Sequence, residues 1–181
     1  MKRVSQRFSR PARWLHGAMA VLILAMLFIG VGMVASVSGR HSWLLAVHKP
    51  LGMVLLLLAI VRIGVRWRHP PPALPQDLPP FQRWAAHASH GLLYGLMLLL
   101  PLIGWAMLSA GGYPVMLTAS LRLPAVIPAG ATAFAWLRHL HAVLAFLLFV
   151  TILVHIAAAL YHGWIRRDEV LASMFRFRRR R

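Results

Sequence analysis

The stretch HLHAVLAFLLFVTILVHIAAALYH, residues 139–162, decides the fold of this 181-residue chain. It is almost entirely apolar over the length of about 20 residues that a helix needs to cross a bilayer. His141 and His155 lie 14 residues apart in it, close to four helical turns, so both side chains share nearly one face. Their rings are separated by about 21 Å along the axis. The segment therefore predicts a membrane helix that presents one histidine near each side of the membrane.

Composition places the whole chain in the membrane class. It is 60% hydrophobic, with a mean hydropathy of +0.68, well above a soluble domain. The long apolar stretches predict four membrane helices at about residues 14–37, 43–65, 85–110 and 135–164. Short connections favour antiparallel neighbours. We expect an all-α membrane protein, an antiparallel four-helix transmembrane bundle that forms a single domain over residues 1–181.

The net charge of +17 is unevenly distributed. Most of the 20 basic residues fall at the N-terminus, at the junction of the second and third helices, and at the C-terminus. The exceptions are Arg40, Lys49, Arg122 and Arg138. By the positive-inside rule both termini are cytoplasmic, so the chain is expected to be a multi-pass inner-membrane protein. The basic clusters suit contact with lipid headgroups rather than with nucleic acid.

The acidic residues are also unevenly distributed between the two sides of the membrane. All of them fall on the predicted cytoplasmic side: Asp77, Asp168 and Glu169. The opposite face then carries four positive charges and no negative side chain, which would attract a small anion. The predicted spans contain no carboxylate. Because proton pumps and metal transporters usually rely on carboxylates inside the membrane, these two functions are disfavoured. The chain has no cysteine, which excludes covalent c-type haem and thiolate-bound iron–sulfur clusters.

Histidines at matched depths provide the main functional prediction. His48 and His141 lie about equally far into their helices from the external side, and His16 and His155 pair in the same way toward the cytoplasm. Each pair could supply two axial nitrogens to one iron between facing helices. The pattern predicts two bis-histidine haems. Zinc is possible by chemistry, but two pairs so far apart fit two large redox cofactors better.

Three further histidines are secondary candidates. His87 and His90 are three residues apart at the cytoplasmic edge of the third helix, and therefore lie on one face. They could bind a haem propionate, bind a quinone carbonyl, or replace His16 as a ligand. His162 lies two turns after His155 and would suit a proton donor beside a quinone. For each of them a solvated interfacial histidine is the plain alternative.

At these residues the chain resembles the bacterial cytochrome b561 family, over nearly its whole length. The segments that carry the resemblance are RWLHGAMAV (13–21), VHKPLGMVLLLLAIVRIGVRWRHPPP (47–72), HASHGLLYGLMLLLPLIGW (87–105) and LRHLHAVLAFLLFVTILVHIAAALYH (137–162). The resemblance implies two haem b groups and a quinone partner. It implies these axial ligands: His16, His48, His141 and His155.

Two redox hypotheses follow from the resemblance. In the first, the protein is an enzyme similar to the small stand-alone members, which look like superoxide:ubiquinone oxidoreductases; superoxide would be drawn to Arg40, Lys49, Arg122 and Arg138. In the alternative, the bundle is a cytochrome b membrane-anchor subunit that passes electrons between a partner dehydrogenase or hydrogenase and quinone. A third hypothesis, without redox chemistry, is a structural or transport bundle.

Overall fold

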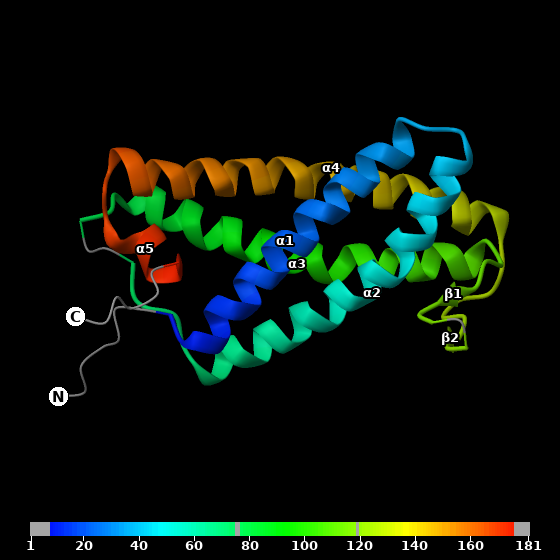
Figure 1. Cartoon of the computed structure of the whole chain (residues 1–181), viewed down its shortest axis with the longest axis horizontal. Helices are drawn as coiled ribbons and strands as arrows, with labels where there is room; N and C mark the ends of the chain where they lie inside the picture. The colour runs from blue at the N-terminus through cyan, green and yellow to red at the C-terminus, as the bar shows by residue number, and fades with distance from the viewer. Residues whose placement is uncertain (1–7, 75–76, 119, 176–181) are drawn as a thin grey trace.

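The computed structural model describes residues 8–74, 77–118 and 120–175. Four long helices run antiparallel through the molecule (Figure 1), which confirms the predicted all-α bundle. They are α1 (Arg10–Val34), α2 (Gly39–Arg68), α3 (Pro80–Ala110) and α4 (Ala131–Leu160). Several basic residues counted above lie outside the described residues: Lys2, Arg3, Arg7, Arg176 and Arg178–Arg181.

Local signals define where the helices begin and end. The Ser9 side chain accepts a hydrogen bond from Ala12 N at 3.4 Å, and Pro11 occupies the first turn of α1, where the missing proline N–H costs nothing. Ser38 caps α2 in the same way. All four long helices begin earlier in the chain than predicted, because the residues before each apolar stretch are compatible with a helix although hydropathy does not count them as membrane-spanning. Helix α2 also ends later than predicted, in a last turn that carries Arg66 and Arg68, whereas α1 ends at Val34, before its predicted limit at residue 37.

The outer surface of the bundle is apolar. Large side chains such as Phe28 and Trp67 are 77% and 81% exposed. All four long helices are long and apolar enough to cross a membrane. A soluble protein would not leave so much apolar surface in water, whereas lipid tails solvate it without cost. The protein is therefore built as a multi-pass membrane bundle.

The bundle is made of two helical hairpins. Helix α1 packs along α2, and α3 packs along α4, while α2 and α3 join the two hairpins. Over the described residues, α4 makes no comparably close backbone contact with α1 or with α2. Helix α4 therefore lies apart from the helical hairpin formed by α1 and α2. The paired histidines face one another across this space.

The two ends of the bundle differ in chemistry. At one end α1 begins, α2 ends, α3 begins and α4 ends (Figure 1); we call it the basic end after Arg62, Arg66 and Arg166. The other, the hairpin end, carries strands β1 (Val115–Met116) and β2 (Arg122–Leu123), which pair antiparallel.

The loop between α3 and α4 folds back onto the end of α3. Helix α3 stops at Gly111, and the next residue, Gly112, has a φ of +70°, a conformation that glycine adopts without strain. Ser109 Oγ then accepts a hydrogen bond from Val126 N at 3.2 Å, and Trp105 Nε1 donates one to Pro124 O at 2.9 Å. The small hairpin was not predicted from the sequence.

At the basic end, α4 continues into one π-helical turn, Tyr161–Ile165, and the chain then forms the short helix α5, Glu169–Phe175. Asp168 links the two, because its Oδ2 lies 2.6 Å from His162 Nδ1 and 3.0 Å from Arg166 Nε. Arg166 also pairs with Asp77 from the connector between α2 and α3. This ion-pair cluster joins three segments at one end of the bundle.

Candidate functional site

The first candidate site is a pair of histidines near the hairpin end. The rings of His48 on α2 and His141 on α4 have centroids 6.2 Å apart and planes inclined at 69°. A Cβ added to Gly104 would lie 3.3 Å from His141 Cε1, so glycine at this position lets α3 pack close to the ring. The Nδ1 atom of His48 is buried and has no hydrogen-bond partner among the described residues. A buried polar atom without a partner is costly, and it indicates a site built for an additional group.

The second candidate site contains three histidines, His16, His90 and His155, which we call the basic-end cluster. The centroids of His16 and His155 are 6.4 Å apart, with planes inclined at 43°. Those of His90 and His155 are 5.7 Å apart, with planes inclined at 66°. Sequence reasoning paired His155 with His16 and left His90 as an alternative. The structure places both against His155.

Both sites fit iron held between two imidazoles. A metal–imidazole bond is about 2 Å long, and the nitrogen lies about 1 Å from its ring centre. Two rings on opposite sides of one iron therefore have centroids roughly 6 Å apart. The observed separations of 6.2 and 6.4 Å agree with this arrangement. A flat macrocycle would have to enter between α4 and the helical hairpin formed by α1 and α2, and this is where the helices lie apart.

The three secondary histidine candidates differ in how exposed they are. His87 is exposed on α3, whereas His90, one turn later, is half-buried and faces His155. His162 lies in the π-helical turn, and its Nδ1 is held by the Asp168 carboxylate. Single π turns occur frequently at functional sites. His162 is therefore oriented by Asp168, whereas His87 is exposed.

The four basic residues predicted to steer an anion all belong to elements at the hairpin end. Arg40, Arg122 and Arg138 are exposed, and Lys49 is half-buried directly after His48. Since Asp77 and Asp168 lie at the basic end, the described part of the chain places no acidic side chain near these cations. The hairpin end is a positively charged surface.

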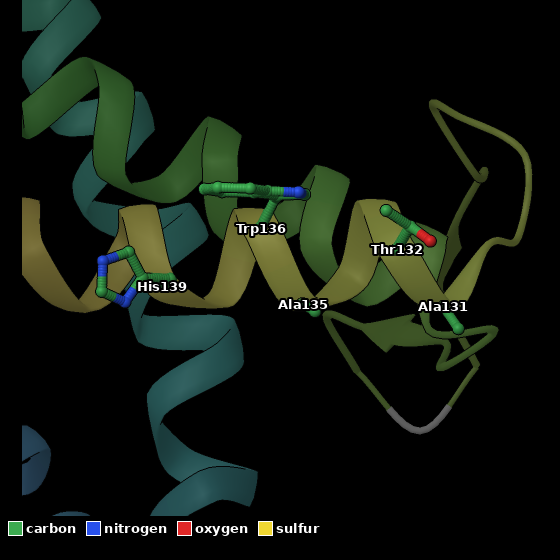
Figure 2. A pocket seen from close by; sticks show the side chains of 5 residues that line it. All are labelled: Ala131, Thr132, Ala135, Trp136 and His139. Atoms are coloured by element: carbon green, nitrogen blue, oxygen red, sulfur yellow. The ribbon is translucent and has the colours of Figure 1, made fainter.

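A shallow groove of about 640 Å³ runs along the first turns of α4 (Figure 2). Its lining residues are Ala131, Thr132, Ala135, Trp136 and His139. Trp136 is 71% exposed, as expected of an aromatic anchor at a membrane interface. His139 is also exposed. The groove is open and lies away from the paired histidines.

Sequence reasoning missed one contact at the basic end. Arg62 Nε on α2 donates a hydrogen bond to Tyr94 Oη on α3 at 3.1 Å. The V-R-x-x-x-R run was visible in the sequence, but the contact with Tyr94 joins residues 32 positions apart. Only the signal of an arginine inside a long apolar stretch could have pointed to it.

Comparisons with known proteins show which family the sequence matches. A family model described as prokaryotic cytochrome b561 matches residues 7–177. The chain is 26% identical over 171 residues to cytochrome b561 homolog 2 of Escherichia coli K12, covering 93% of this chain and 91% of the relative. It is 29% identical over 134 residues to a probable superoxide oxidase, CybB, of Yersinia pestis, covering 74% and 76% of the two chains.

Proposed function

The chain belongs to the prokaryotic cytochrome b561 family, and we propose that it oxidises superoxide at the hairpin end and reduces ubiquinone. Family membership makes it a membrane electron-transfer protein of the bacterial inner membrane that binds haem b. The finer assignment is supported by its similarity to the probable superoxide oxidase. The observation that carries it is the separation of two histidine sites at opposite depths of one bundle.

Two haem b groups are proposed, with His48 and His141 holding one and His16 and His155 holding the other. Haem b, when bound, supplies the reversible one-electron chemistry of its iron. The proposed ligands come from three different helices, α1, α2 and α4.

The hairpin end is proposed to face the periplasm, and the basic end the cytoplasm, as the positive-inside rule requires. Superoxide is a small anion, and Arg40, Lys49, Arg122 and Arg138 create a positive field that raises its local concentration. Lys49 directly follows His48 on α2, so one of these charges belongs to the same helical turn as a proposed ligand. Two superoxide anions would be oxidised to two O₂ for each ubiquinone that takes up two electrons and two protons.

The basic end is proposed to contact the quinone. His162 lies two turns after His155, and Asp168 fixes its ring through Nδ1. A carboxylate that holds one ring nitrogen of a histidine sets the role of the other nitrogen. Nε2 would then be positioned to exchange a proton with a quinone oxygen. His87 and His90 remain the other candidates for quinone or propionate contact.

Stopped-flow spectroscopy of the purified protein tests the proposal. We expect superoxide to reduce the haem bands, and added ubiquinone to reoxidise them with the stoichiometry given above. Neutralising Lys49 and Arg122 should lower the superoxide rate about tenfold at low ionic strength, and less at high salt. A rate that responds neither to salt nor to these substitutions would refute the steering.

The alternative, a cytochrome b anchor subunit, makes the opposite prediction. Haem reduction would then be slow with superoxide and fast only with a docked dehydrogenase or hydrogenase. A protein with no reducible haem bands would contradict both redox functions and would favour a structural or transport bundle.

A further inference from the structure

Two arginines at the basic end of α2 converge on one tyrosine of α3. Arg62 Nε donates to Tyr94 Oη at 3.1 Å, and Arg62 Nη1 donates to Ala12 O on α1 at 3.2 Å. The guanidinium of Arg66 lies 5.7 Å from the centre of the Tyr94 ring. One polar cluster thus ties α1, α2 and α3 together inside the span. We call Arg62, Arg66 and Tyr94 the arginine seat.

The arginine seat borders a small cavity of about 20 Å³. Arg62, Arg66 and Tyr94 line it together with Ala12 and residues at the end of α2. A cavity of about 10–15 Å³ is enough to hold one water-sized atom. The space therefore suits a single oxygen atom placed between two guanidinium groups.

Among the described side chains, no negative charge balances the seat. Asp77 and Asp168 pair with Arg166 and His162, and no carboxylate of the described side chains lies within ion-pair distance of Arg62. Arg62 has five N–H donors, of which its two hydrogen bonds use two. Half-buried arginines in an apolar span are costly unless an anion joins them. Since no described side chain supplies this anion, an anion from outside the chain would complete the seat.

The position of the seat indicates what that anion is. Arg62 contacts Ala12 on α1 and Tyr94 on α3. Ala12 lies four residues before His16, and Tyr94 lies four residues after His90, one helical turn in each case, so the seat adjoins the basic-end cluster. Haem b carries two carboxylates, the propionates, on one edge of its ring. A guanidinium forms short, charge-assisted hydrogen bonds to carboxylate oxygens, and the cavity has room for one such oxygen.

We propose that Arg62, oriented by Tyr94 and assisted by Arg66, binds a propionate of the haem at the basic-end cluster. The inference rests on the proposed di-haem function. It assigns to Arg62 and Tyr94 the propionate contact that sequence reasoning gave to the histidines. A positive charge beside this site disfavours the more positive, ferric state, so Arg62 raises the reduction potential on the side of the bundle proposed to face the quinone.

Redox titration of the visible spectrum is the test, with resonance Raman of the propionate bending modes as a second measurement. Arg62→Gln should lower the midpoint potential of one haem, leave the other unchanged and alter the propionate bands. Tyr94→Phe, which keeps the charge but removes the orienting hydroxyl, should produce a smaller shift in the same direction. Arg68→Gln is the matched control, since Arg68 is exposed on the same helix end and should change nothing.

Several outcomes would overturn the inference. Equal shifts of both haems, or unchanged potential and propionate bands in both Arg62→Gln and Tyr94→Phe, would show that the seat does not hold a propionate. If Arg62→Gln loses haem entirely, Tyr94→Phe and Arg66→Gln provide the measurement. A lipid phosphate is the competing occupant. It would make the wild-type potential depend on phosphatidylglycerol in nanodiscs, with unaltered propionate bands in the variant. Absence of haem in the wild-type protein would instead refute the proposed function itself.

Discussion

Removal of single histidines should remove one haem and spare the other. His48 and His141 face each other at 6.2 Å, and His155 lies about 21 Å along α4 from His141. One macrocycle cannot use ligands from both depths. We therefore expect His48→Ala to reduce the haem content from two per chain to one, and His155→Ala to do the same at the other depth.

Double variants make this prediction quantitative. Substitutions that destroy the same site are not additive, whereas those at distant sites are. His48→Ala combined with His141→Ala should retain one haem per chain, as each single variant does. His48→Ala combined with His155→Ala should retain none.

The assay is the pyridine haemochrome content per protein, read together with a redox spectrum. His139→Ala is the matched control, because His139 is exposed two residues before His141 and should keep both haems. Both haems retained in His155→Ala, or a further loss in the His48/His141 double variant, would refute the pairing derived from the geometry.

Three other substitutions test separate parts of the structure. Asp168→Asn should slow ubiquinone reduction by about 10-fold with haem content unchanged, because it removes the negative charge that orients His162; an unchanged rate would argue against a role for His162. Gly104→Leu should disturb only the spectrum of the haem beside His141, since a Cβ there already lies 3.3 Å from Cε1; unaltered bands would contradict this packing. Ser109→Ala should destabilise the loop between α3 and α4 by about 1 kcal/mol, because it removes the side-chain acceptor of the Val126 N–H; hydrogen exchange confined to that loop would reveal it, and unchanged protection would count against it.

Much of the fold could be predicted because the bilayer limits the backbone conformations that a membrane-spanning segment can adopt. Backbone polar groups in lipid must be satisfied within the segment, so each long apolar stretch has to be a helix. The basic clusters then predicted which helix ends gather together. The elements at the two ends of the bundle were not predicted. Helix α5, the π-helical turn and the β1–β2 hairpin lie where no single periodicity dominates, and there tertiary contacts such as Arg166 with Asp77 decide the conformation.

The amino-acid sequence by itself determined the membrane class, the four spans and the depth of each histidine, since apolar length and helical spacing follow from local chemistry. Only the tertiary structure decided which rings meet. Depth allowed His16, His87 or His90 as partners for His155, and the packing of α1 and α3 turns His16 and His90 inward while His87 stays exposed. The same packing brought Arg62 to Tyr94 across two helices. Depth is a property of one helix, whereas the facing of two rings depends on how each helix is rotated against its neighbours.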